Sequence, residues 1–292
     1  MSRLKILIVG RTGQVGWELC RSMAPLGDVT AIDYPEIDFL NEAGVRERVK
    51  SARPDILINA AAYTAVDKAE SEPAKAHQVN AAAPAIMAAE AAELGALLVH
   101  YSTDYVYDGT TKGAYVEEDA PNPLNVYGKS KLAGDHAIVQ SGCRFLIFRL
   151  CWVYGARGQN FMRTILRLAA EREQLKVVAD QFGAPTWSRM IAEATAFAVK
   201  HVTSVADSTS YHGIYHLAAS GHTSWHGFAS RIVDRMPGEG RKCAAVLPIR
   251  TDEYPLPARR PARSVLNCAK LEKTFGLKLP DWQESLDRVL EN

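Results

Sequence analysis

The sequence has few cysteines and no arrangement that would link them. The five are Cys20, Cys143, Cys151, Cys243 and Cys268, an odd number without a Cys-x-x-Cys pair or a neighbouring histidine cluster. A disulfide framework needs paired cysteines, and a structural zinc site needs closely spaced cysteine or histidine ligands. We therefore predict neither a disulfide scaffold nor a metal centre, and we expect a reducing, cytoplasmic location.

The sequence also lacks an excess of one charge and a long hydrophobic run. Lys and Arg total 34 against 33 for Asp and Glu, whereas duplex-binding proteins normally carry a clear basic excess. The longest apolar stretches, such as Ile56–Val66, are shorter than the roughly 18 residues that span a bilayer. The first apolar run, Ile6–Gly10, meets Arg11 at once and lacks a signal-peptide cleavage pattern. We predict no nucleic-acid partner and no membrane partner.

The first half of the 292-residue chain alternates short apolar runs with helix-like stretches. The runs are too short for buried helices and are bounded by Gly, Pro, Asp or Asn, as strands are. The expected strands are Lys5–Val9, Val29–Ile32, Asp55–Asn59, Leu97–Tyr101 and Arg144–Leu150. The expected helices are Gln14–Met23, Ala43–Ala52, Pro73–Glu93 and Val126–Gln140. This alternation predicts an α/β fold: a doubly wound, Rossmann-like parallel sheet with ligands outside the carboxyl ends of its strands.

A glycine-rich turn follows the first expected strand and opens the first expected helix. Gly10, Gly13 and Gly16 are spaced G-x-x-G-x-x-G. Glycines let the backbone approach a pyrophosphate closely, and the helix N-terminus offers free N–H groups to its charge. Asp33, at the end of the second strand, suits a carboxylate bonded to the adenosine ribose. Arg11 could meet a 2′-phosphate instead, so the turn predicts NADH or NADPH without choosing between them.

The regular alternation of expected strands and helices ends at about residue 150. Helices are expected at Asn160–Glu173 and Ser188–Val202, and strands at Lys176–Val178 and Gly213–Ala218. We predict a dinucleotide-binding domain over residues 1–150, completed by part of 188–218. The remainder of 151–292 is expected to form a smaller C-terminal α/β substrate-binding domain.

A second motif, Tyr127-x-x-x-Lys131, lies on the helix that follows the fourth strand. Residues four apart share one helix face, so both side chains can reach one target. A phenol titrates near 10, and a nearby ammonium with an oxidised nicotinamide would bring its pKa toward the working range. Thr103, at the end of the fourth strand, could hydrogen-bond a reacting carbonyl. His100 and His216 lie in apolar strands and are expected to be hydrogen-bonded core histidines rather than catalysts.

Together with Asn59–Ala62 and Ser102–Asp104, these motifs resemble the extended short-chain dehydrogenase/reductases. Within that superfamily the closer resemblance is to the dTDP-4-dehydrorhamnose reductase family, and it runs nearly end to end. The segments that carry it are Gly13–Leu19, Ala65–Glu70, His100–Val106, Pro123–Lys129, Trp152–Tyr154, Asp180–Thr186 and Arg260–Pro261.

The resemblance implies a nucleotide-sugar substrate, reduction of its C4 carbonyl by NADPH or NADH, and a role for each matching position. Thr103, Tyr127 and Lys131 would be the catalytic set. Thr103, Asp104, Trp152 and Arg260 would contact the sugar nucleotide. The cofactor groove would be lined by Gly10, Arg11, Thr12, Gly13, Gln14, Val15, Gly16, Asp33, Asp38, Phe39, Ala62, Tyr63, Thr64, Tyr101, Tyr127 and Lys131.

The basic cluster of Arg259, Arg260 and Arg263 fits the two phosphates of such a substrate, because the guanidinium fork suits phosphate oxygens. Arginines in a proline-rich loop can equally be solvated, and Trp152 can equally be core packing.

The resemblance also implies a possible homodimer and, in some relatives, a magnesium ion held by glutamates at a subunit contact. Glu18 matches one such position, whereas Arg189 occupies another. Magnesium is therefore possible but not expected here.

Two other functions remain open from the residues. A sugar-nucleotide epimerase or dehydratase of the same superfamily is one, although a dehydratase would need an Asp-Glu pair where Asp104 is followed by Tyr105. The other is a nucleotide-binding regulatory subunit without turnover. The complete Thr103, Tyr127 and Lys131 set favours catalysis.

Overall fold

Six parallel strands form the centre of the larger lobe. The computed structural model describes residues 3–291. The strands are β1 (Leu4–Val9), β2 (Gly27–Ile32), β3 (Ile56–Asn59), β4 (Leu97–Thr103), β5 (Arg144–Leu150) and β10 (Gly213–Leu217). Their order in the sheet is β10-β5-β4-β3-β1-β2, and every neighbouring pair is parallel. The predicted doubly wound sheet is confirmed.

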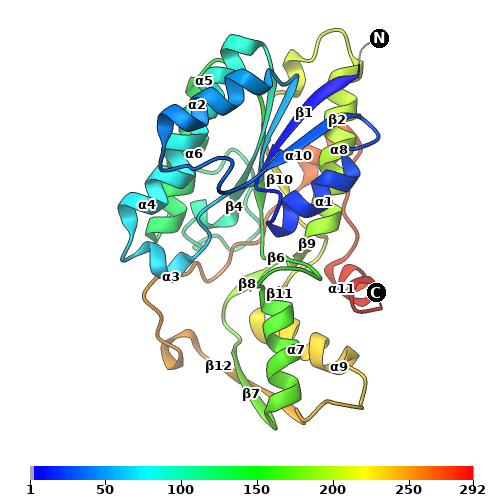
Figure 1. Ribbon diagram of the computed structural model, residues 1–292. Coiled ribbons are helices and arrows are strands. Elements are labelled where there is room, and N and C mark those ends of the chain that lie inside the picture. The colour runs from blue at the N-terminus through cyan, green and yellow to red at the C-terminus, as the bar shows by residue number, and fades with distance from the viewer. Residues whose placement is uncertain (1–2, 292) are drawn as a thin grey trace.

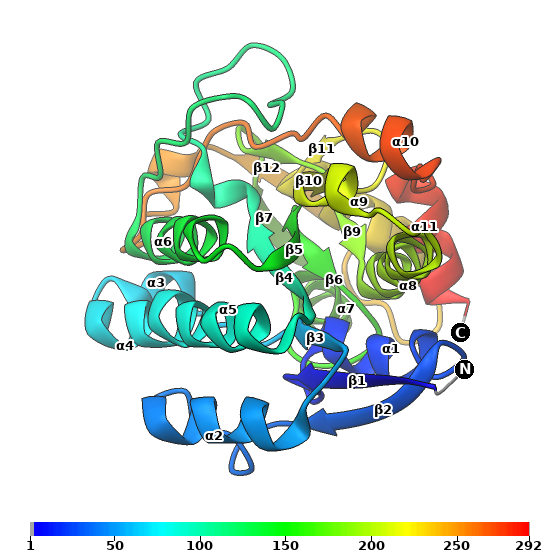
Figure 2. The ribbon, with the colours of Figure 1, turned by 90° about the horizontal axis from the view of Figure 1, so that it is seen from above.

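Helices cover both faces of this sheet (Figures 1 and 2). One face carries α2 (Glu42–Ala52), α5 (Ala83–Leu94) and α6 (Val126–Gln140), and the other carries α1 (Gln14–Ser22), α8 (Ser188–Ser204) and α10 (Ala269–Phe275). Each face has its own apolar cluster, because β-strand side chains alternate between the two faces. Burial on both faces explains why the strands read as continuous apolar runs: all seven residues of β4 are buried.

The predicted helix Pro73–Glu93 is present but is not uniformly α-helical. It consists of α4 (Pro73–His77), a π-helical turn η1 (Gln78–Ala82) and α5. Asn80 in the π turn is buried, and it binds the backbone of Tyr63 and the hydroxyl of Ser130. The turn therefore fastens the loop after β3 to α6, the helix that carries the tyrosine–lysine motif.

The sheet reverses its winding beside β1. The chain moves from β1 outward to β2 and then returns to β3 on the other side of β1. A crevice forms at the carboxyl ends of the strands where such a reversal occurs, and ligands of doubly wound sheets bind there. The glycine-rich turn after β1 and the Ala60–Thr64 segment after β3 both lie at this end.

A smaller lobe packs below that edge of the sheet (Figure 1). It contains α7 (Phe161–Glu171), α9 (Trp225–Arg235), α11 (Trp282–Leu290) and the parallel pair β7 (Gln174–Val178) and β12 (Ala245–Ile249). Tyr154, Phe228 and Trp282 are central to its separate apolar cluster. The remaining short elements are β6 (Val153–Tyr154), β8 (Phe182–Gly183), β9 (Thr186–Trp187), β11 (Thr223–Ser224), α3 (Val66–Ala69), η2 (Asp104–Val106), η3 (Thr209–Tyr211) and η4 (Thr251–Glu253).

The two lobes are interleaved along the chain. After α7 and β7 the chain returns to the large lobe, where α8 packs against α1 and β10 pairs with β5. It then builds α9 and β12 before segment 254–268 runs back along the edge of the sheet, where Tyr115 bridges Leu266. Within residues 3–291, no helix is long and apolar enough to cross a membrane.

Candidate active site

The glycine turn leaves no room for side chains. Gly10 has φ +95, and a Cβ there would lie 2.6 Å from the backbone nitrogen of Ala61. A Cβ on Gly16 would lie 2.0 Å from the carbonyl oxygen of Gly10. The turn is thus pressed against the Ala60–Ala61 segment that follows β3 and against its own helix, and α1 begins at Gln14 with its N-terminus free of a side-chain cap. This geometry fits a dinucleotide pyrophosphate, which needs close backbone approach and free N–H groups.

Charged side chains organise the next part of the groove, at the end of β2. The Asp33 carboxylate accepts hydrogen bonds from the Thr12 backbone at 2.9 Å and from its hydroxyl at 2.6 Å. These bonds hold the pKa of Asp33 below its usual value against the opposing effect of burial. Arg11 donates to the Ala31 carbonyl and pairs with Glu36, both at 2.7 Å. One carboxylate and one neutralised guanidinium therefore flank the position expected for the adenosine ribose.

The three predicted catalytic residues come together at the carboxyl edge of β4. Asn125 caps α6 by accepting from the Gly128 N–H, and this cap fixes the first turn, where Tyr127 lies. Tyr127 is partly buried, and the Tyr105 ring meets its ring edge-on at 6.0 Å. Burial raises the pKa of the Tyr127 phenol to about 12, and the charge of Asp104 adds to this, whereas a hydrogen bond with Thr103 lowers it.

That direction is opposite to the lowering expected from a neighbouring lysine ammonium. Burial has the largest effect on the pKa of both side chains. Lys131 is itself removed from water, since it is only 1% exposed. Burial lowers the pKa of Lys131 to about 8, and only the charge of Asp135 raises it. At neutral pH the phenol is therefore fully protonated, as a proton donor must be.

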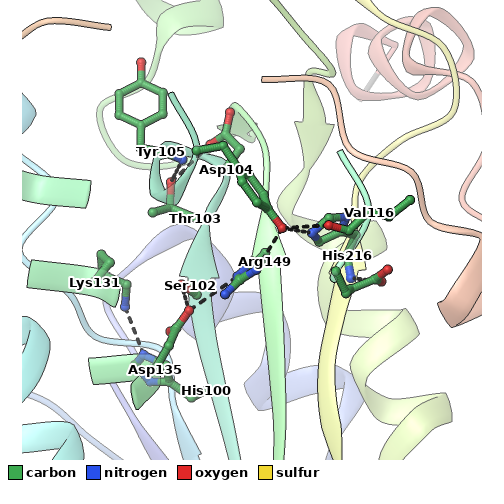
Figure 3. A network of polar contacts seen from close by, with 12 residues as sticks. His100, Ser102, Thr103, Asp104, Tyr105, Val116, Lys131, Asp135, Arg149 and His216 are labelled. Carbon is green, nitrogen blue, oxygen red and sulfur yellow. Dashed lines mark hydrogen bonds and ion pairs between the residues drawn. The ribbon is translucent and has the colours of Figure 1, made fainter. Parts of the chain in front are cut away.

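His100 and Asn59 complete the surroundings of Lys131, and sequence reasoning did not assign either a role there. The lysine amine points to the His100 ring, with Nζ 3.0 Å from Nε2 (Figure 3). The other ring nitrogen, Nδ1, is 3.1 Å from Nδ2 of Asn59. Asn59 and His100 are direct partners in the β3–β4 pairing. A signal did exist in the sequence: Asn59 ends the apolar strand β3, and His100 interrupts the apolar run of β4.

Behind this group, a buried ionic network crosses the sheet (Figure 3). Asp135 on α6 accepts from Ser102 at 2.8 Å and pairs with Nε of Arg149 on β5 at 3.4 Å. Arg149 also donates to the Tyr107 hydroxyl at 2.8 Å, and that hydroxyl lies 2.8 Å from Nε2 of His216. His216 is thus the hydrogen-bonded core histidine that its strand position predicts.

Asp104, the residue after Thr103, is buried and nearly surrounded by weak donors. It accepts from the Thr103 hydroxyl at 3.1 Å and from the Cys151 thiol at 3.2 Å. Burial raises the pKa of Asp104 to about 6, and these hydrogen bonds oppose that shift. A carboxyl group that is partly protonated near neutral pH can donate as well as accept at the floor of the site.

Trp152 projects into the junction between the lobes in a conformation that most residues avoid. Its φ is +43, in the left-handed region that favours glycine. Its ring stacks on Trp225 at 3.5 Å, and a Cβ on Gly183 would lie 2.5 Å from that ring. The packing holds the indole in place. Strained backbone of this kind is typical of functional sites, which indicates that the orientation of this side chain matters.

Arg260 reaches the site from the C-terminal loop. Its guanidinium makes a two-pronged ion pair with Asp67, at 3.0 and 2.7 Å, next to Tyr105. The Asn125 side chain holds the same loop through the carbonyl of Arg259 at 2.8 Å. Arg263 instead donates to the carbonyl of Gly113. The three arginines therefore do not form one cluster, and only the Arg260 side chain is fixed beside the catalytic group.

The other predicted cofactor residues lie at the same end of the sheet with one exception. Tyr63 is tied to Asn80 and Glu72, in the loop that also holds Ala62 and Thr64. Asp38 and Phe39 lie after β2, in the connection to α2. Tyr101 is buried, and its hydroxyl bonds to Thr195 on α8 at 2.8 Å, so that hydroxyl faces the core and not Tyr127.

Arginines surround the Glu18 position at which the resemblance implies a possible magnesium ion. The Glu18 carboxylate accepts from Arg21 at 2.8 Å and lies 3.5 Å from Nε of Arg189. Magnesium needs several oxygen ligands, whereas two guanidinium groups already neutralise this carboxylate. Among residues 3–291, no three His, Cys, Asp or Glu side chains are grouped to hold a metal. Burial raises the pKa of Glu193, and the charge of the nearby Glu18 adds to this shift, so two carboxylates and two guanidinium groups meet at this position.

Comparison with known proteins gives matches along the whole chain. Residues 4–292 match the family described as RmlD substrate binding domain. The dTDP-4-dehydrorhamnose reductase of Burkholderia thailandensis is 49% identical over 285 residues, which cover 96% of each chain. The crystal structure of the dTDP-4-dehydrorhamnose reductase of Clostridium acetobutylicum covers 99% of both chains with a TM-score of 0.91 at 35% identity. The Bacillus anthracis reductase, solved in complex with NADP, has a TM-score of 0.89 at 35% identity, over 100% of this chain and 99% of that one.

Proposed function

This chain belongs to the RmlD substrate binding domain family, and on that premise we propose that it reduces the C4 carbonyl of dTDP-4-dehydro-L-rhamnose to dTDP-L-rhamnose with NADPH or NADH. The observation that carries the proposal is the match to dTDP-4-dehydrorhamnose reductases over nearly the full length of the chain, at 48–49% sequence identity. The site supports it, because a protonated phenol, a buried amine and a threonine hydroxyl meet at the strand edge where the glycine turn also lies.

The dinucleotide supplies the hydride when it is bound in the groove of the glycine turn. Tyr127 supplies the proton: its phenol O–H bond breaks as the oxygen on the sugar C4 gains that proton. Thr103 donates a hydrogen bond that orients the carbonyl and stabilises the negative charge developing on its oxygen. Lys131, when charged, stabilises the phenolate that remains on Tyr127.

The sugar nucleotide is proposed to lie between the lobes, against Asp104, Trp152 and Arg260. The rigid stacked indole offers an apolar wall for a 6-deoxy sugar ring. Asp67 and the Ala258 carbonyl hold Arg260 close to Tyr105, where its positive charge can attract a phosphate oxygen. In this arrangement residues 1–150 with α8 and β10 bind the dinucleotide, and the smaller lobe binds the substrate.

A cytoplasmic location and a homodimer are further proposals. All five cysteines are free thiols, which supports a reducing compartment. Sedimentation equilibrium would distinguish a dimer from the 32.0 kDa monomer.

The function is tested by the oxidation of NADPH with a panel of 4-keto nucleotide sugars. We expect dTDP-4-dehydro-L-rhamnose to be consumed with one NADPH per sugar, and dTDP-glucose with NAD to give no 4-keto product. Oxidation of NADPH with none of the 4-keto sugars would contradict the proposal and favour a regulatory subunit. Formation of a 4-keto product from dTDP-glucose would favour a dehydratase.

Replacing Glu36 with glutamine is expected to shift the cofactor preference toward NADPH. Glu36 neutralises Arg11 next to the expected ribose position, and its removal frees the guanidinium for a 2′-phosphate. Because the pair is exposed and screened by solvent, the ratio of kcat/KM for NADPH over NADH should rise only about two- to fivefold. Glu93→Gln, which removes an exposed glutamate paired with Lys50, is the matched control. An unchanged ratio in Glu36→Gln would contradict a role for this pair.

A further inference from the structure

The amide of Asn59 has only one orientation that satisfies its neighbours. Asn59 is 2% exposed, and its Oδ1 accepts the backbone N–H of Ala61 at 3.2 Å. Rotating the amide by half a turn would put an NH₂ group against that N–H donor. The amide nitrogen therefore faces His100 and donates to Nδ1 at 3.1 Å.

This bond in turn fixes the proton on His100. The ring is fully buried, and burial together with the charge of Lys131 lowers the pKa of His100 well below its usual value, so the ring is neutral. A neutral imidazole that accepts at Nδ1 carries its hydrogen on Nε2. That N–H points at Lys131, whose Nζ is 3.0 Å away.

A lysine side chain can accept a hydrogen bond only as a neutral amine, because an ammonium has no lone pair. We propose that Asn59 and His100 together control the charge of Lys131: Asn59 holds His100 as the Nε2–H tautomer, which donates to Nζ and favours the neutral amine. Charging Lys131 would require the opposite tautomer, with Nδ1–H against the Asn59 amide donor. His100 is thus a positioning residue that acts through Lys131.

Other charged groups around α6 act on the same amine. Asp135, one turn further along α6, favours the ammonium, but Arg149 on β5 neutralises part of its charge. Asp104 on η2 acts on Tyr127 rather than on Lys131. The charges on the neighbouring helices are paired with one another: Asp67 with Arg260, Lys68 with Glu72, and Glu90 with Arg46 and Lys50. Burial opposes Asp135 and lowers the pKa of Lys131 to about 8. The proposed hydrogen bond from His100 would act in the same direction as burial.

This inference deepens the proposed function, in which the charged lysine is the active form. Below its pKa Lys131 is an ammonium that supports the Tyr127 phenolate; above it the amine is neutral, and turnover falls. The Asn59–His100 pair thus places the alkaline limit of the reaction near neutral pH, and weakening the pair moves that limit upward.

The first test reads the tautomer directly and needs no turnover. The full chain is labelled with ¹⁵N at its eight histidines, and two-bond ¹H–¹⁵N correlation spectra are recorded, with His100 assigned by its loss in His100→Gln. At pH 9, above the pKa of Lys131, we expect His100 to be a neutral Nε2–H tautomer. In Asn59→Asp, where a carboxylate replaces the amide donor, we expect the Nδ1–H tautomer. A wild-type Nδ1–H tautomer at pH 9 would overturn the proposal, whether or not the protein is a reductase.

The second test is the pH profile of kcat/KM. In His100→Gln the amide can turn its oxygen to Lys131, so the alkaline limb should move up by about one pH unit. His216→Gln is the matched control, because it removes an equally buried histidine that bonds to Tyr107 and to the Asn267 carbonyl. We expect it to lower the melting temperature without moving the limb. An unmoved limb in a folded His100→Gln, or an equal shift in His216→Gln, would overturn the proposal.

Discussion

Replacing Tyr127 with phenylalanine is expected to lower kcat by about 10²–10⁴-fold, the usual contribution of a positioned acid. The phenol is the proton donor proposed for the sugar alkoxide, and its pKa of about 12 keeps it protonated throughout the neutral range. Phenylalanine keeps the edge-on ring contact with Tyr105, so the shape of the cleft is preserved. NADPH binding, which depends on the glycine turn, should change by less than about twofold.

Two measurements separate this loss of a proton from a loss of structure. NADPH binding is followed by fluorescence titration, and turnover by NADPH oxidation at saturating sugar. Tyr215→Phe is the matched control: it removes a buried hydroxyl that donates to the Tyr211 carbonyl at 2.8 Å, on the far strand of the sheet. It should cost about 1 kcal/mol of stability and leave kcat unchanged. Tyr127→Phe with wild-type turnover would remove the phenol from the mechanism.

The sheet could be predicted from sequence because burial on both faces leaves a strong local signal. Strand β5 has the predicted bounds Arg144–Leu150, because a run of apolar residues marks it. Helix α6 has the predicted bounds Val126–Gln140, because an asparagine cap marks its start. The π turn at Gln78–Ala82 could not be predicted, because its bonds with Tyr63 and Ser130 come from segments distant in sequence. The pairing of β10 with β5 likewise depends on a return of the chain from the other lobe, which no local pattern encodes.

Part of the candidate site could likewise be predicted from the sequence, and part could not. Tyr127 and Lys131 could be related from sequence, because helical spacing alone puts them on one face. The contact of Lys131 with His100, and of His100 with Asn59, depends on the register of β3 against β4, which the sequence leaves open. The prediction of one cluster of Arg259, Arg260 and Arg263 was wrong, because Arg260 pairs with Asp67 and Arg263 donates to the Gly113 carbonyl, and both partners are distant in sequence.

The ion pair between Asp135 and Arg149 is expected to dominate stability near the site. Both side chains are almost fully buried, at 0% and 3% exposure, and Oδ1 of Asp135 has no hydrogen-bond partner. Replacing Arg149 with methionine would leave the carboxylate buried with only Ser102 as a donor. Loss of one partner of a buried pair typically costs about 3–5 kcal/mol, and we expect that loss in the free energy of unfolding at pH 7.

The pH dependence identifies the cause of that loss. Burial raises the pKa of Asp135, and Arg149 is the largest influence that opposes the rise, so the variant carboxyl should titrate higher still. A folded pKa above the unfolded value means that the native state binds more protons and that stability falls as the pH rises through that window. Urea unfolding should therefore show a smaller deficit for Arg149→Met at pH 5 than at pH 7. Asp135→Asn/Arg149→Met should recover part of the deficit at pH 7, because neither member of the pair is then left charged without its partner. A deficit that is equal at both pH values and persists in the double variant would instead mean that lost packing against Tyr107 is responsible.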